Sequence, residues 1–407
     1  MAPTSRVGIA LLGAAAILPL GLREFHVHLL TEILILGLFA VGFNLLFGYT
    51  GLLSFGQAAY FAAGAYVCAL WLKGPWPSLP IGLVLGALLA GAAALVVGWL
   101  CVRRDEIYFA MVTLACAQLI YVAIWRWRTV TGGSDGIGGI PRPALDLGVA
   151  ALDLSRTLHF YYFTLAVVTA ALYVLWRITR SPFGLALRAV RDNHRRVDYL
   201  GLPMRRYRLA AFAVSGVFCG LAGALFAPYQ GTITPAVADW LWSAEPVMMT
   251  LLGGPGVFLG PVLGAAVITL LKDFVASATE YWPLIVGTVV VLLVLFLPGG
   301  AGGAVRDAVA RRLAAGRVET GSAASSRAAG LDAGRAVGTG AAVLDASNGV
   351  GAGAAVLEGS GGVGARAALL EAGTGVGPGA PGLEAGSSVG ARVEGTAAPA
   401  PPGRRSR

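Results

Sequence analysis

The sequence predicts an all-α polytopic membrane protein with about ten membrane segments, some of them interrupted helices. Of its 407 residues, 57% are hydrophobic and 13% are charged, and the mean hydropathy is +0.74. Soluble domains carry about 25% charged residues, and a membrane-crossing helix needs about 20 apolar residues. The apolar segments of about this length, the first and last being shorter, are 7–22, 28–47, 54–72, 80–102, 107–125, 159–176, 208–230 and 283–297.

The region 232–271 is also apolar, and the distribution of arginines decides how we count it. It is either one crossing or two shorter arms hinged at the run GGPG (253–256). Arginines accumulate on the cytoplasmic side of membrane proteins, so those at 103–104, in 177–208 and after the last helix should share one side. This requires an even number of crossings between 208 and 297. We therefore expect 232–271 to cross twice, or to enter and return, and both termini to be cytoplasmic.

The two ends of the chain differ in composition. Residues 7–22 follow Arg6 and could pass for a signal peptide, but the sequence PLGLREF lacks a small-x-small cleavage site, so we keep them as a first membrane helix. Residues 301–407 contain no Phe, Trp or Tyr and repeat a Val-Gly pair every 13 residues. We predict a transmembrane domain over 1–300 and a disordered, Gly/Ala-rich tail over 301–407, because little apolar bulk offsets the ordering entropy. A small-residue solenoid or an interaction tail is the alternative.

The most strongly charged stretch is the loop 181–208 between two apolar segments. Residues 177–208 hold nine arginines and two aspartates, and nine less two leaves a net charge of +7 out of +9 for the whole chain. Pro182 can begin a helix, and Gly201 with Pro203 can end one. The apolar residues between them recur at roughly helical spacing: Leu185, Leu187, Val190, Val197, Leu200 and Leu202. We expect an amphipathic cytoplasmic helix-turn-helix, of the kind that a membrane protein offers to a partner.

Two interruptions fall within the apolar segments, at FGYTGLLSFGQ (47–57) and at GGPG (253–256). Broken helices are tolerated at membrane depth only where they are buried in protein or line a cavity, and in transporters they mark the substrate route. An ordinary tight turn at the membrane surface is the alternative for each. The candidate residues of a translocation path are Asn44, Gly51, Ser54, Gln57, Gly253, Gly254 and Gly256. The external loop 126–158 carries TGGSDGIGGIP (131–141), whose glycines and aspartate suit a structured turn.

No catalytic or metal site is predicted. Neither Lys73 nor Lys272 belongs to a GxxxxGK[ST] phosphate-binding loop, so any ATP must be bound by another subunit. The four histidines occur without a HExxH motif or paired carboxylates. The four cysteines form no CxxC pair and fit small buried hydrophobic residues.

Several stretches match one known family, in its order, over roughly residues 28–300. They are GFNLLFGYTGLLSFGQAAYFAAGAY (42–66), TGGSDGIGGIP (131–141), FYYFTL (160–165), SPFGLALRAVRDN (181–193) and MTLLGGPGVFLGPVLGA (249–265). The sequence resembles the membrane permease subunits of branched-chain (hydrophobic) amino acid ABC importers, especially the longer of the two permease types.

The resemblance implies a half-transporter in the bacterial plasma membrane that forms the path for branched-chain or other small amino acids. Its partners would be a second homologous permease subunit, two cytoplasmic ATPase subunits that bind the ATP, and an extracytoplasmic solute-binding protein, with no nucleic acid and no cofactor of its own. The loop 181–208 corresponds to the coupling loop that docks on the ATPase. The residues that match the pattern of that loop are Gly184, Arg188, Arg191, Asp192, Asn193 and Gly201. After Asn193 the sequence departs from the family pattern, which puts the choice of ATPase partner in doubt.

Two alternatives remain at this point. A permease of the same superfamily could carry another small solute, such as an amide or urea, a sugar or a nucleoside. An ion-coupled carrier working alone would need acidic residues deep in the membrane. Glu32 and Glu245 are the candidates for that role, but both lie near the predicted external edge.

Overall fold

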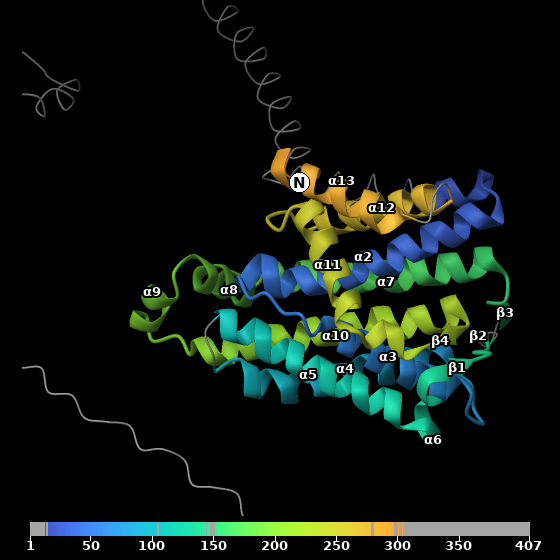
Figure 1. Ribbon diagram of the computed structural model, residues 1–407, viewed down its shortest axis with the longest axis horizontal. Helices are drawn as coiled ribbons and strands as arrows, with labels where there is room; N and C mark the ends of the chain where they lie inside the picture. The colour runs from blue at the N-terminus through green and yellow to red at the C-terminus, as the bar shows by residue number, and fades with distance from the viewer. Residues whose placement is uncertain are drawn as a thin grey trace, which may run out of the picture. The chain divides into compact units, whose positions relative to one another are not determined.

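The structure is a computed structural model that describes residues 13, 15–103, 106–143, 145–146, 151–277, 281–296, 300 and 303. Most of these residues are helical (Figure 1). The longer helices are α2 (Glu24–Thr50), α3 (Gln57–Leu72), α4 (Leu79–Cys101), α5 (Glu106–Arg126), α7 (Thr157–Arg180), α10 (Met204–Gln230), α11 (Trp240–Gly253), α12 (Gly260–Ala276) and α13 (Trp282–Phe296). The shorter elements are η1 (Leu18–Gly21), α6 (Arg128–Thr131), η2 (Gly133–Asp135), α8 (Pro182–Asp192), α9 (His194–Tyr199), η3 (Pro235–Ala238), β1 (Ile137–Gly138), β2 (Leu145–Asp146), β3 (Ala151–Leu152) and β4 (Thr232–Ile233).

Five of the described helices are long and apolar enough to cross a membrane: α2, α4, α5, α7 and α10. Helix α3 and residues 283–292 of α13 form shorter apolar helices. Of the predicted segment 7–22, residues 7–12 and 14 lie outside the described residues, and Leu18–Gly21 form η1. The tail 301–407 lies outside them apart from Gly303. The described part is therefore a helical, multi-pass bundle, and the number of ten membrane segments stays a prediction.

The region 232–271 forms two helices rather than one. Helix α11 has 14 residues and α12 has 17, and residues 254–259 separate them. The two helices pack against each other and against α2. Their backbones come so close that a Cβ at Gly264 would overlap the carbonyl oxygen of Met249. Of the two expected arrangements, the structure has two arms joined at the glycine-rich break.

Helix α2 lies inside the bundle and contacts α7, α10, α11 and α12. At 27 residues it is about 40 Å long at 1.5 Å per residue. A helix that is apolar on all sides is normally buried, and from Ile35 to Leu46 every residue of α2 is buried. Because α2 is covered on all sides, groups on its last turns are positioned by several other helices at once.

Helices α3, α4 and α10 pack closely through small residues. A Cβ at Gly223 of α10 would overlap the carbonyl oxygen of Phe61 in α3, and a Cβ at Gly64 would overlap that of Gly220. Membrane helices associate through such small residues because lipid supplies no hydrophobic force between them. The glycines of these segments therefore serve close helix packing.

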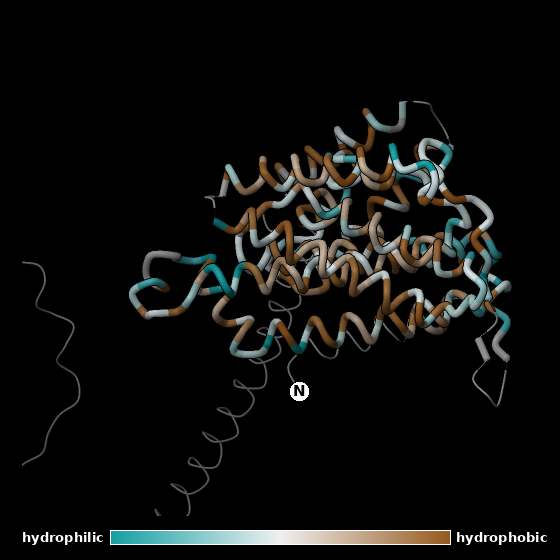
Figure 2. Tube along the Cα trace, turned by 90° about the horizontal axis from the view of Figure 1, so that it is seen from below, coloured by the Kyte–Doolittle hydropathy of each residue, from teal (hydrophilic) through white to brown (hydrophobic). Residues whose placement is uncertain are grey.

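The polar parts of the described chain gather at its two ends (Figure 2). One end holds α8 and α9. The other holds the loop 131–141, in which Gly132, Gly133, Gly136 and Gly139 all have positive φ, so that the predicted structured turn is confirmed. There β1 pairs antiparallel with β4, with Ile137 opposite Ile233. Below, these are called the α9 end and the β1 end.

Candidate functional site

The loop 181–208 folds as the predicted helix-turn-helix. Ser181 precedes α8, Pro182 stands in its first turn, and Gly201 adopts a left-handed φ of 72° after α9. Gly184 lies against the end of α7, where a Cβ would overlap the Thr179 carbonyl oxygen. Pro182 and Gly201 thus determine where the hairpin begins and ends. The absence of a side chain at Gly184 allows α8 to pack closely against the end of α7.

The apolar residues of this hairpin divide between two faces. Leu187, Val190 and Val197 are buried against the bundle, whereas others face outward: Leu185 is 64% exposed, Tyr199 90% and Leu200 75%. Exposed apolar groups on a charged hairpin are typical of an interaction surface. The adjacent exposed pair Tyr199 and Leu200, called the apolar tip below, was not singled out from the sequence, because helical spacing alone assigned Leu200 to the same stripe as the buried residues.

The two arginines of α8 that match the coupling-loop pattern contact the end of α2. The Arg191 guanidinium donates a hydrogen bond to the Gly48 carbonyl oxygen. The Arg188 guanidinium lies over the ring of Tyr49, 5.0 Å from its centre. Both side chains are otherwise exposed, as are those of Asp192 and Asn193. A direct contact of these four residues with an ATPase stays a prediction.

The first interruption, residues 51–56, joins the end of α2 to the start of α3. Gly51 has a φ of 76° and ends α2. The Ser54 hydroxyl oxygen accepts a hydrogen bond from the Gly56 N–H at 3.2 Å. Gln57 is the first residue of α3 and, like Asn44 on α2, is fully buried. Neither amide side chain has a hydrogen-bond partner among the described protein groups.

The second interruption, residues 254–259, lies against α2 near the first. Gly254 ends α11 with a φ of 90°, and Gly253 packs against the backbone of Gly260. Gly256 is exposed, with open space around it. The Pro255 carbonyl oxygen would be 2.5 Å from a Cβ placed on Gly48, whose other neighbour is the Asn44 side chain. The structure thus brings Asn44 and the second interruption together, while Gly256 points away from that contact.

A second polar cluster occupies the β1 end. The Tyr229 hydroxyl donates to the Glu32 carboxylate at 3.1 Å, and the His28 ring stacks on Tyr229 with centroids 4.3 Å apart. Arg142 donates to the carbonyl oxygens of Pro228 (2.7 Å) and Tyr229 (2.8 Å) at the end of α10. Burial lowers the pKa of the Arg142 guanidinium, but arginine stays charged at neutral pH.

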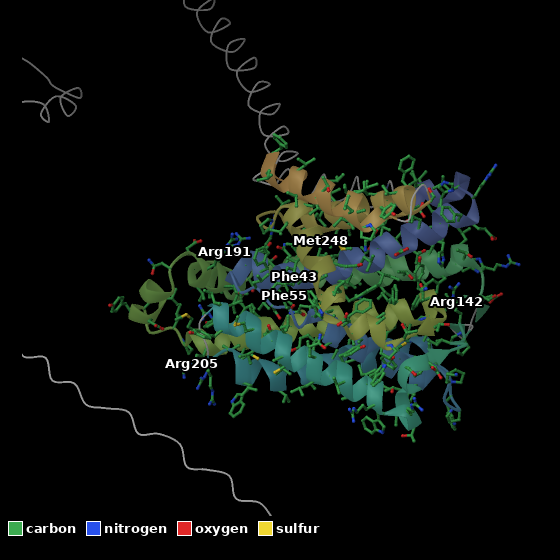
Figure 3. All side chains as sticks on the ribbon, in the orientation of Figure 1. Phe43, Phe55, Arg142, Arg191, Arg205 and Met248 are labelled. Atoms are coloured by element: carbon green, nitrogen blue, oxygen red, sulfur yellow. The ribbon has the colours of Figure 1, made fainter. Side chains whose placement is uncertain are left out.

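The acidic residues considered for ion coupling both have partners in the structure. Glu245 of α11 forms an ion pair with Lys272 of α12, and Glu32 accepts the hydrogen bond from Tyr229. Both lie toward the β1 end, away from the interruptions. Figure 3 shows the separation of the two ends, with Arg191 at the α9 end and Arg142 at the β1 end. The arrangement favours a structural role for the two acids over coupling at membrane depth.

Two hollows of the described surface lie away from the predicted path residues. One hollow of about 240 Å³ is lined by Trp125, Arg126, Arg128 and Ser134, and an apolar groove of about 610 Å³ runs along α7. Neither is lined by the seven path residues named from the sequence. Among the described residues, no group of three or more His, Cys, Asp and Glu could hold a metal ion.

Apolar helices that cross a membrane repeatedly, two interruptions that approach one another at α2, and an arginine-rich helical hairpin at one end define a membrane transport protein. The chain belongs to the family described as the permease component of branched-chain amino acid transport systems, whose model matches residues 25–297. The match extends from the start of α2 to the end of α13.

Individual relatives agree with the family. The chain is 30% identical to the high-affinity branched-chain amino acid transport system permease protein LivM of Escherichia coli over 319 residues, covering 72% of this chain and 73% of the relative. It is 30% identical to LivM of Salmonella typhimurium over the same shares of both chains. It is 26% identical to the probable branched-chain amino acid transport permease protein LivH of Methanocaldococcus jannaschii, over 64% of this chain and 84% of the relative. No solved structure matches the chain.

Proposed function

We propose that this chain is a membrane-spanning subunit of an ABC importer and forms part of the path by which branched-chain amino acids enter the cell. The family match over 25–297 carries the proposal, because it includes α2 to α13 and therefore both interruptions and the α8–α9 hairpin. The partners are a second, related permease subunit, two ATPase subunits that bind the ATP, and an extracytoplasmic binding protein.

Co-purification of the tagged protein from its native membranes, with mass spectrometry of the recovered chains, tests the assembly. We expect a second permease and ATPase subunits. A homo-oligomer without an ATPase would contradict the proposal.

Uptake of labelled leucine by the recovered complex in liposomes, compared with labelled urea and a labelled sugar, tests the substrate. Leucine uptake that requires ATP is the expected result, and uptake of one of the other solutes alone would reassign the substrate.

We propose that the α9 end faces the cytoplasm and the β1 end the outside, as the nine arginines of 177–208 suggest. Single cysteines report this orientation cleanly because Cys68, Cys101 and Cys219 are buried and Cys116 is half-buried. We expect a membrane-impermeant maleimide to label Trp76→Cys, near the β1 end, in intact cells. Tyr199→Cys should react only after the membrane is permeabilised. Labelling with the two positions reversed would invert the proposed orientation.

We propose that the apolar tip, rather than the arginines alone, docks on the ATPase. Tyr199 and Leu200 are 90% and 75% exposed on an arginine-rich hairpin, and tyrosine is one of the residue types that most often contribute a large share of the binding energy at an interface. We expect Tyr199→Ser combined with Leu200→Ser to lower the recovered ATPase about tenfold or more, which corresponds to at least 1.4 kcal/mol. Trp76→Ser, which removes a residue that is 79% exposed near the other end, is the matched control. Full recovery of ATPase with the double variant would refute docking through the tip.

A further inference from the structure

The last turns of α2 are contacted by two segments that lie far from it in the sequence. From one side comes α8. The Arg191 guanidinium donates to the Gly48 carbonyl oxygen, and the side-chain stem crosses Gly51, with Cγ 3.3 Å from the position that a Cβ there would occupy. Arg188, one turn earlier on α8, covers the Tyr49 ring. The contact between α8 and α2 thus rests on two charged side chains and a glycine.

The Gly48 carbonyl is available because it lies in the final turn of a helix. The last four carbonyls of a helix have no partner within it, and their negative end attracts cations. In α2 the Phe47 carbonyl accepts the Gly51 N–H at 3.2 Å, and the Leu46 carbonyl accepts the Leu52 N–H at 3.3 Å. The Gly48 carbonyl is instead satisfied from outside by Arg191. The hydrogen bond therefore ties α8 to a group of α2 that the helix itself leaves unpaired.

The second interruption approaches the Cα of Gly48. The Pro255 carbonyl oxygen approaches so closely that a Cβ on Gly48 would lie 2.5 Å from it, a separation that real Cβ atoms do not adopt. Only glycine permits this contact. Gly48 consequently contacts α8 through its carbonyl and the break between α11 and α12 through its Cα.

A buried amide lies beside this contact. Asn44 lies one turn before Gly48 and is 0% exposed, and both polar atoms of its side chain lack a hydrogen-bond partner among the described protein groups. A buried polar group without a partner is costly. The Asn44 side chain and the Pro255 carbonyl oxygen thus border the same position above Gly48, so a shift of residues 254–259 would change the surroundings of this amide.

We propose that Gly48 is the junction through which movement of α8 reaches the second interruption, with Arg191 as the positioning residue that transmits it. The inference rests on the proposed function, in which the α8–α9 hairpin docks on an ATPase. It assigns Arg191 a task inside the permease, whereas the sequence resemblance implied a contact with the ATPase. Docking on the ATPase is assigned to the exposed apolar tip.

The test uses the complete importer in proteoliposomes and measures three quantities for each variant: recovered ATPase, rate of ATP hydrolysis, and leucine transported per ATP hydrolysed. We expect Arg191→Gln to recover the ATPase and hydrolyse ATP as the wild type does, with transport per ATP reduced about tenfold. Arg191→Lys, which keeps the cation, should restore part of the transport. Arg126→Gln, which makes the same change at an exposed arginine at the end of α5, is the control and should match the wild type.

Gly48→Ala tests the other side of the junction and keeps the inference falsifiable if Arg191→Gln fails to fold. We expect it to reduce transport per ATP as well. Gly287→Ala in α13, where a Cβ meets no atom within 4 Å, is its control. Unchanged transport per ATP in Arg191→Gln or Gly48→Ala would overturn the junction, and so would loss of ATPase recovery in Arg191→Gln, which would make Arg191 a docking residue. Absence of an ATPase from the wild-type preparation would instead refute the proposed function.

Discussion

Replacement of Gly223 by alanine is expected to separate α3 from α10 and to destabilise the bundle. A Cβ at this position would overlap the Phe61 carbonyl oxygen. That oxygen belongs to the backbone of a buried helix and cannot rotate away as a side chain could. Overpacking of this kind costs about 1–3 kcal/mol, which exceeds the gain of up to about 1 kcal/mol that alanine brings over glycine inside a helix.

The measurement is the apparent midpoint of thermal denaturation in detergent, followed by the loss of the monodisperse peak on size-exclusion chromatography. We expect Gly223→Ala to lower the midpoint by roughly 5 °C. Gly287→Ala is the matched control, because it has open space for the new methyl group and gains only the helix preference. Equal midpoints for Gly223→Ala and the wild type would show that α3 and α10 do not approach as closely as described.

The second large effect is expected from Lys272→Met, which leaves Glu245 without its ion-pair partner. The two side chains are 25% and 13% exposed. Removal of one partner from a fully buried pair costs about 3–5 kcal/mol, and partial exposure reduces this to roughly 2 kcal/mol. Adding Glu245→Gln to the Lys272→Met variant should restore most of the lost stability, because the unpaired charge is then removed.

The same double variant separates a structural pair from an ion-coupling acid. If Glu245 serves only to hold α11 against α12, the combination of Lys272→Met and Glu245→Gln should regain ATP-dependent leucine uptake together with stability. Thermal midpoints and uptake are measured on the same preparations, with Arg126→Gln as an exposed charge-removal control. Restored stability without uptake would contradict the structural role and would return ion coupling to consideration.

The elements that were predicted well are those with local causes. Apolar runs of about 20 residues gave the positions of α2, α4, α5, α7 and α10, because the length of a membrane helix is set by the bilayer. Pro182 and Gly201 located the α8–α9 hairpin through backbone preferences that act within one turn. The glycines of 131–141 indicated a turn for the same reason.

Contacts between distant segments could not be predicted in this way. Arg191 was recognised by its place in a motif, but nothing near it in the sequence indicates the Gly48 carbonyl, 143 residues earlier. The predicted path residues Asn44 and Gly253 were found by their residue types. Pro255, which makes the contact with α2, was not named as a path residue, because a proline in a break is explained by its role in ending a helix. The count of ten membrane segments depended on the expectation that the chain crosses the membrane an even number of times between 208 and 297. The described helices do not establish how many times the chain crosses.

The sequence by itself determined that this protein is a helical membrane permease with an arginine-rich hairpin at one end and two interrupted segments, because hydropathy, charge and turn residues act over short distances. Only the tertiary structure decided that α2 is the buried centre, that α11 and α12 form a hairpin against it, and that Arg191 and Pro255 meet it on two sides of one glycine. These contacts depend on which helix surfaces fit together within van der Waals distance. The hydrophobic period and composition of a single helix do not indicate which other helix its surface fits.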